Sequence, residues 1–196
     1  MNTGFYARRV LVMGMLTMAC IQPAMAADVK GTVFEETITL GGKELKLNGA
    51  GMRTKSLFSI YAMGLYLSEK KTSPEDVQSV AGPKRVKLVY QRELNSDEFG
   101  QLFISAMNNN STKEQKASLI NQTVQFGEIF ANQGKVSKGD YTTMDWIPGT
   151  GTVTSFNGKK IGETLAGIEF YNAVMRIWLG EKPADTTLKA QLLGSK

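Results

Sequence analysis

The sequence has no histidine and only one cysteine among its 196 residues. Without imidazole, the chain cannot build a Ser-His-Asp or Cys-His catalytic group, and it cannot ligate zinc or haem through histidine. The single cysteine, Cys20, lies near the N-terminus, so no disulfide can form within the chain. The commonest hydrolytic and metal-dependent enzyme classes are therefore excluded, and we expect neither a metal site nor a cofactor.

Long apolar runs are scarce, and the one near the N-terminus is short. Val10 to Ala19 follows two arginines and is about ten residues long, too short to span a bilayer. Ala24-Met25-Ala26 then gives the small-x-small pattern of a signal-peptidase site. The pattern predicts a signal peptide over 1–26, cleaved after Ala26, and a periplasmic or secreted domain over 27–196.

A second interpretation makes Cys20 a lipid-attachment cysteine, because it follows the apolar run directly. Thr17 stands where such a signal would have a leucine, which argues against this lipoprotein alternative.

Charge of either sign is not concentrated in any segment. The net charge is +5 for the whole chain, and it falls to +3 without residues 1–26, which hold two arginines and no acid. Scattered lysines and arginines do not make a nucleic-acid footprint.

No later run is long enough to be a transmembrane span. We expect one domain with no nucleic-acid partner and no span in the mature chain.

Apolar alternation and turn residues predict strands over 32–40, 43–47, 57–67, 85–91, 141–147, 151–156 and 159–161. Both parities of 57–67 are apolar, so this strand should be covered on both faces. Asn157-Gly158 is a typical two-residue hairpin turn.

Cap residues and apolar periodicity predict helices that start near residues 73, 95 and 111 and that span 165–179 and 183–193. The second should bury Phe99, Leu102, Phe103 and Met107, and the third, opened by a capping box at 111–114, Ile120, Val124 and Phe130. Strands interrupted by helices in this order predict an α+β fold, a single domain with an antiparallel β-sheet and helices packed on one face.

Arg53 and Tyr61 are the unusual residues of the apolar stretch 48–67. A guanidinium beside a two-faced apolar strand must reach water, pair with an acid, or receive an anionic ligand. If 53–61 were one straight strand, the two α-carbons would lie about 26 Å apart. A tight turn at 54–56 would place Arg53 opposite Leu57, about 13 Å from Tyr61, and a carboxylate could then bridge both side chains. Spacing alone leaves a structural arginine equally open.

The stretch "GAGMRTKSLFSIYAMGLYL" resembles a pattern of the chalcone-isomerase fold: a glycine-rich turn, an arginine, a hairpin and a strand ending in A-x-G-x-Y-L. The segment "GKKIGETLAGIEFYNAVMRIWLGEKPADTTLKAQLLG" resembles the closing helices of the same family. The resemblance extends over most of 32–194. It implies a sheet with helices on one side and a ligand in an apolar cleft between them.

The resemblance also implies where a site would lie. In the isomerases an arginine, a threonine, a tyrosine and an asparagine act on the flavonoid oxygen. Arg53 matches the arginine, whereas Tyr61, Phe99 and Ala106 fall at the other three positions, and Ile177 replaces a further threonine. Two polar donors have thus become apolar, and losing such donors commonly costs orders of magnitude in rate. The fatty-acid-binding relatives use an arginine and a tyrosine on a carboxylate.

Three hypotheses follow. The first is a non-catalytic binding protein for an amphipathic carboxylate such as a fatty acid, with Arg53 and Tyr61 at the head group. The second is an isomerase or lyase acting on a chalcone-like enone, with Arg53 as electrophile and Tyr61 as proton donor. The third is a structural or partner-binding role, with a collapsed cleft and Arg53 paired to Glu93 or Glu163. Candidates for the cleft walls are Phe99, Phe103, Trp146 and Trp178.

Overall fold

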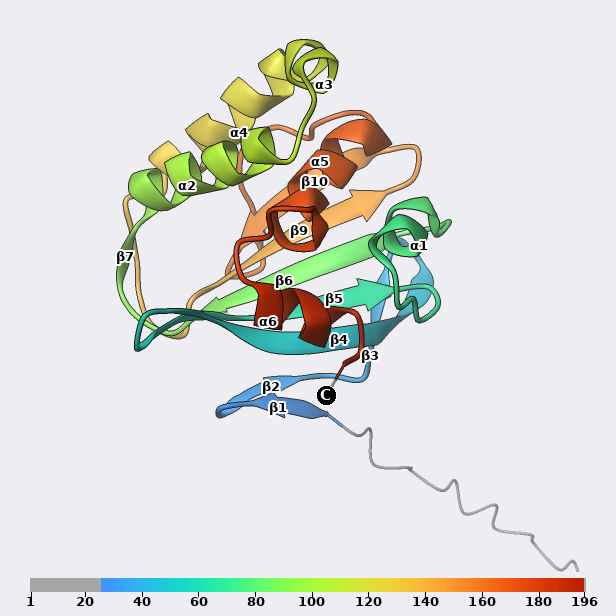
Figure 1. Cartoon of the computed structure of the whole chain (residues 1–196), viewed down its shortest axis with the longest axis vertical. Coiled ribbons are helices and arrows are strands. Elements are labelled where there is room, and N and C mark those ends of the chain that lie inside the picture. The colour runs from blue at the N-terminus through green and yellow to red at the C-terminus, as the bar shows by residue number, and fades with distance from the viewer. Residues whose placement is uncertain (1–25, 196) are drawn as a thin grey trace, which may run out of the picture.

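The computed structural model describes residues 26–195 and confirms the α+β class with one large antiparallel sheet (Figure 1). The predicted signal peptide and Cys20 lie outside the described residues, apart from Ala26. The sheet has the strand order β11-β10-β9-β6-β5-β4-β3. Its strands are β3 (Thr37–Leu40), β4 (Lys43–Lys55), β5 (Phe58–Leu67), β6 (Lys84–Tyr90), β9 (Tyr141–Ile147), β10 (Gly151–Phe156) and β11 (Lys159–Lys160).

Six helices and two small two-stranded sheets complete the residues that the structure describes. The helices are α1 (Pro74–Ser79), α2 (Ser96–Asn109), α3 (Lys113–Ser118), α4 (Ile120–Ala131), α5 (Ile168–Leu179) and α6 (Thr186–Leu192). The small sheets pair β1 (Ala27–Val29) with β2 (Thr32–Phe34), and β7 (Leu94–Asn95) with β8 (Lys135–Val136). Within residues 26–195, no helix is both long and apolar enough to cross a membrane.

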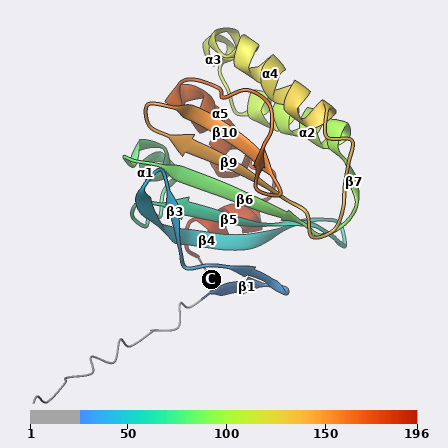
Figure 2. The same cartoon turned by 180° about the vertical axis from the view of Figure 1, so that it is seen from behind.

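The helices cover one face of the sheet, as predicted. Figure 1 shows α5 and α6 in front of the strands, and Figure 2, turned by 180°, shows the strands in front instead. The core between them contains Met63, Leu65, Val86 and Leu88 from the strands and Trp178 from α5. The hydrophobic effect of burying these large side chains is the main contribution to the stability of the fold.

The β1–β2 hairpin covers part of the opposite face. Phe34 is fully buried in a second core cluster with Ala62 and Tyr66. Its ring lies directly over Gly64, where an added Cβ would come within 2.6 Å of the ring. This arrangement confirms that β5 is buried on both faces. The exceptions are at the start of the predicted strand: Leu57 lies outside β5 and is 97% exposed, and Phe58 is 61% exposed.

The predicted strand 32–40 is wrong as one element, because it divides between two sheets. Residues 32–34 pair with β1, and 37–40 pair with β4. Glu35 and Glu36 lie at the break, and the amide of Leu47 donates to the Glu36 carbonyl over 2.7 Å. The change of direction lets Phe34 reach the outer face of the sheet while β3 extends its edge.

The predicted long helix after residue 111 is interrupted at Leu119. Its backbone leaves helical geometry (φ −105°, ψ 8°) between α3 and α4, which changes the phase of the apolar face. Ile120 and Val124 are therefore exposed, contrary to the prediction, whereas Phe130 is buried as predicted. The other residues that α4 buries are Thr123, Phe126 and Ile129. The capping box lies one residue later than predicted, between Thr112 and Gln115.

Leu102 was also predicted to be buried and is 52% exposed on α2. Phe99, Phe103 and Met107, which lie four residues apart along one side of the same helix, are buried as predicted.

Candidate functional site

The β4–β5 hairpin brings Arg53 and Tyr61 together. The turn is formed by Ser56 and Leu57, slightly later than the predicted turn at 54–56, and Ser56 adopts a left-handed backbone (φ 55°). An irregularity in the register leaves Ile60 as an extra residue on β5, so Arg53 pairs with Tyr61 directly. The predicted hairpin is confirmed, but the predicted pairing of Arg53 with Leu57 is wrong. Arg53 and Tyr61, the two candidate head-group residues, therefore lie closer together than the distance of about 13 Å that strand geometry predicted.

The guanidinium of Arg53 lies against the Tyr61 ring, with 5.5 Å between its central carbon and the ring centroid. The side chain is half-buried, and its Nε is buried without a hydrogen-bond partner. Among residues 26–195, the ion pairs are Lys71–Glu69, Arg85–Asp145 and Lys135–Glu93, so Arg53 has no carboxylate partner. The pairing of Arg53 with Glu93 considered from the sequence is thus not formed, and neither is the pairing with Glu163.

The Tyr61 hydroxyl is fully buried and accepts a hydrogen bond of 2.7 Å from the indole N–H of Trp178. Burial raises the pKa of Tyr61 to about 12, against the opposing effects of the Arg53 charge and the Trp178 hydrogen bond. The phenol therefore keeps its proton at any ordinary pH and can donate it to an acceptor.

Aromatic rings enclose this pair on the helix side. The ring of Phe99 meets Tyr61 edge-on at 5.7 Å and contacts Phe103 at 4.5 Å, and Phe103 meets Trp178 at 5.4 Å. Edge-to-face contacts of this kind stabilise an aromatic cluster beyond the area that it buries. Five of the six candidate residues thus come together, but their rings fill the space that was expected to be a cleft.

Trp146 is the sixth candidate and lies elsewhere. It pairs with Lys84 at one end of β6, whereas Tyr61 pairs with Tyr90 at the other end. These pairs lie six positions apart along β6, about 20 Å at the usual rise. Trp146 is half-buried and contacts Tyr171 of α5. It can therefore border only the far end of a long ligand.

The residues before Arg53 hold α6 against the sheet. An added Cβ on Gly49 would lie 2.1 Å from the backbone oxygen of Gln191, and one on Gly51 would collide with the Gln191 side chain. Asn48 is buried and donates to the carbonyls of Lys71 and Leu192. The glycine-rich stretch thus has a packing role that the sequence analysis did not identify.

Sequence reasoning also missed Asp185 and Tyr90. Asp185 caps α6 through the Leu188 amide and accepts a hydrogen bond of 3.2 Å from the Thr54 amide, next to Arg53. It is close enough to raise the pKa of Tyr61. The ring of Tyr90 packs edge-on against Phe99, which also contacts Tyr61, and the Tyr90 hydroxyl forms a hydrogen bond of 2.9 Å with the Thr142 hydroxyl. The alternation of apolar residues along β6 could have predicted that Tyr90 points into the core.

The positions implied by the isomerase resemblance are apolar in the folded chain. Phe99, where the isomerases have a tyrosine, offers Tyr61 only a ring. Ala106 is half-buried on α2, and Ile177 is buried on α5. None of the three can orient water or stabilise an oxygen anion.

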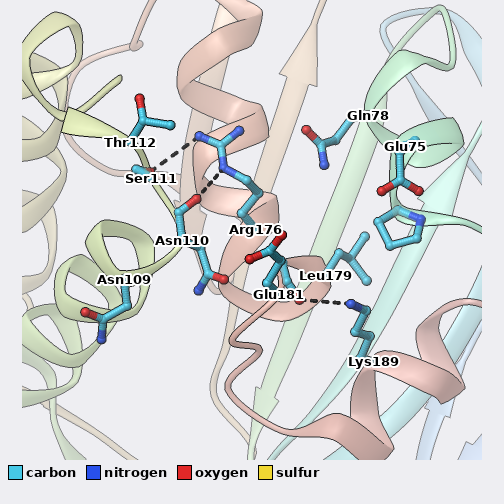
Figure 3. A pocket seen from close by; sticks show the side chains of 12 residues that line it. Glu75, Gln78, Asn109, Asn110, Ser111, Thr112, Arg176, Leu179, Glu181 and Lys189 are labelled. Carbon is cyan, nitrogen blue, oxygen red and sulfur yellow. Dashed lines mark hydrogen bonds between the residues drawn. The ribbon is translucent and has the colours of Figure 1, made fainter. Parts of the chain in front are cut away.

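A polar pocket of about 410 Å³ lies between α1, α6 and the ends of α2 and α5 (Figure 3). Arg176 donates from Nε to the Asn110 carbonyl over 2.9 Å, and Lys189 donates to the Gly180 carbonyl over 2.9 Å. Glu75 and Glu181 line the same pocket. Its cations already have acceptors and nearby acids, so it does not resemble the surroundings of Arg53, and no candidate residue lines it.

The sequence matches the chalcone isomerase-like family over residues 26–194, which is most of the chain. The chain belongs to the chalcone isomerase-like family. The arrangement of sheet and helices that the resemblance implied is therefore confirmed. Among curated proteins, none matches this sequence significantly.

Solved structures share the fold of this family member. One is the crystal structure of a fatty-acid binding protein from Arabidopsis thaliana, with a TM-score of 0.64 and 16% sequence identity, covering 83% of this chain and 92% of that chain. At this identity the likeness establishes the fold and not the ligand.

Proposed function

We propose that this protein is a non-catalytic binding protein for an amphipathic carboxylate such as a fatty acid. Arg53 and Tyr61 would hold the head group, and the aromatic cluster around Phe99, Phe103 and Trp178 would contact the tail. The signal-peptide pattern at residues 1–26 supports a periplasmic location for this activity. The solved structure with a similar fold is named as a fatty-acid binding protein.

The observation that carries the proposal is that Arg53 forms no ion pair among the described residues, although Asp185 accepts from the neighbouring Thr54 amide. The Nε of Arg53 is buried without a partner, and within 26–195 no acid forms an ion pair with it. A carboxylate at this point could accept from the guanidinium and from the Tyr61 hydroxyl, whose high pKa keeps it a donor. Charge-assisted hydrogen bonds are the stronger class, so this head group would be recognised in preference to a neutral one.

The tail requires a rearrangement. Because the rings of Phe99 and Phe103 pack edge-on against Tyr61 and Trp178, an acyl chain can enter only if these rings turn aside or α2 moves outward. The released space would be lined by aromatic carbon, which suits an acyl chain. The part of the binding energy that moves the rings is lost from the affinity.

Replacing Arg53 by alanine tests the proposal. The dissociation constant for palmitate, measured by isothermal titration calorimetry, should rise about tenfold to a hundredfold, on the scale of one charged hydrogen-bonded contact. Lys116→Ala removes an exposed cation from α3 and should leave the constant unchanged. Equal affinity for wild type and Arg53→Ala, or no binding by wild type, would instead favour the structural role with a collapsed cleft.

The same two residues would serve the alternative, an intramolecular lyase acting on a chalcone-like enone. Arg53 would stabilise the oxygen anion and Tyr61 would donate a proton. The apolar neighbours Phe99, Ala106 and Ile177 oppose it, since none can orient water. We expect the visible absorbance of a chalcone to decay no faster with the protein than in buffer. Decay that Arg53→Ala abolishes would establish the enzyme instead.

A further inference from the structure

The tip of the β4–β5 hairpin presents two adjacent apolar side chains to solvent. Leu57 is 97% exposed and Phe58 is 61% exposed. In Figure 1 this turn projects at the left end of the sheet, beyond the start of β5. Exposed apolar residues scattered singly are normal, whereas these two neighbouring side chains form a small continuous apolar surface on a projecting turn.

Cations surround the tip. The Arg92 guanidinium lies over the Phe58 ring, 5.2 Å from its centroid, and Lys55 is exposed in the last position of β4. Glu93 is the acid next to Arg92, and it is paired with Lys135 at 3.2 Å. The apolar tip is therefore bordered by positive charge.

A basic pocket adjoins the tip on the same end of the sheet. Its volume is about 580 Å³, and its lining includes Lys30, Lys87 and Lys138 but no acidic residue. Gln91 joins the two features: it lines the pocket, it precedes Arg92, and its amide N–H donates to the carbonyl of Ile60 near the tip. The side chain of Gln91 also bonds Thr32, which ties the β1–β2 hairpin to this end.

The nearby acids Asp28 and Asp140 offset part of this charge, but neither of them lines the pocket. Asp28 accepts from the Gly31 amide over 2.8 Å. Asp140 accepts from the Ser137 amide and from Asn157. Both carboxylates bond to amide groups of the loops, and the three lysines that line the pocket outnumber these two acids.

We propose that this end of the molecule docks on a bilayer that contains anionic phospholipids. Leu57 and Phe58 enter the boundary between head groups and acyl chains, while Arg92 and the lysines of the basic pocket face the phosphates. Membrane-surface binding grows with buried apolar area and with attraction to anionic lipid, and this surface combines both. The inference goes beyond carboxylate binding and holds whatever the ligand is. It also places Arg53, four residues before Leu57, next to the bilayer.

Vesicle co-sedimentation tests the docking. Wild type should sediment with vesicles of phosphatidylcholine and phosphatidylglycerol and much less with phosphatidylcholine alone. The double variant Leu57→Ser/Phe58→Ser should bind at least about tenfold more weakly, because the apolar contribution is lost. Lys30→Ala/Lys138→Ala should lose about fivefold for each lysine, and only on the anionic vesicles. All proteins are compared as the predicted mature chain, residues 27–196, so the differences report on the tip and the pocket.

Matched controls are available on α2 and α3, outside the tip and the basic pocket. Leu102→Ser removes a leucine that is 52% exposed on α2, and Lys113→Ala removes an exposed lysine on α3; neither should change sedimentation. Circular dichroism melts confirm that each variant folds. Equal sedimentation of wild type and Leu57→Ser/Phe58→Ser would overturn the proposal. So would absence of vesicle binding together with a dimer that this variant dissociates, because the tip would then be a protein interface.

Discussion

Replacing Trp178 by alanine is expected to lower the free energy of unfolding by about 3–5 kcal/mol, the range for removing a large aromatic side chain from a core. The indole is fully buried, contacts Phe103 edge-on, and donates the hydrogen bond that the Tyr61 hydroxyl accepts. The variant therefore loses apolar contacts, leaves a cavity, and leaves the phenol buried without this donor. Urea denaturation monitored by circular dichroism measures the loss.

Trp146→Ala is the matched control, because it removes the same side chain from a half-buried position on β9. Its loss should be less than half that of Trp178→Ala, since part of this ring is already in water. Equal losses would show that the Trp178 cluster is not the packed centre of the helix-side core. That result would also undermine the argument that an acyl tail must displace these rings.

Replacing Asp145 by alanine should be the second most damaging change, with a loss of about 3 kcal/mol, at the low end of the range for breaking a buried ion pair. Asp145 is 4% exposed and pairs in register with Arg85 on the neighbouring strand. The two nitrogens of Arg85 donate to its two oxygens over 2.6 and 2.5 Å. The variant leaves the Arg85 side chain, which is 24% exposed, without these acceptors, so some water can still reach the charge.

The double variant Arg85→Met/Asp145→Leu distinguishes the net contribution of the ion pair from the cost of leaving one buried charge without its partner. Replacing a buried ion pair by apolar side chains of similar volume is often neutral, so most of the loss should be recovered, to within about 1 kcal/mol of wild type. A double variant as unstable as Asp145→Ala would mean that the carboxylate stabilises the fold through other contacts. Denaturation midpoints of the three proteins give the answer.

The contrast between Arg85 and Arg53 is informative for function. Both are half-buried on strands of one sheet, but Arg85 has a bidentate carboxylate partner and Arg53 has none within the part of the chain that the structure describes. The fold thus provides an internal acid for one arginine and leaves the other beside a phenol. This difference is why the proposed head-group site rests on Arg53.

Most strands and helices could be predicted from the sequence because their signals are local. β9 and β10 were predicted with their observed bounds, and strand 57–67 was correctly expected to be covered on both faces. The errors arose where tertiary packing decides. The sequence predicted one long helix after residue 111, but Leu119 interrupts it. This break decides which side chains of α4 face the core.

The sequence by itself determined the α+β class and the family, and it singled out Arg53 and Tyr61 as candidate site residues on one hairpin. Residue order and local periodicity carry this information. Only the tertiary structure decided that a strand irregularity places the two side chains opposite each other, and that Trp146 lies apart from them. It also decided that aromatic rings fill the space beside Tyr61. Register and ring packing depend on contacts between segments far apart in the chain, which no local pattern records.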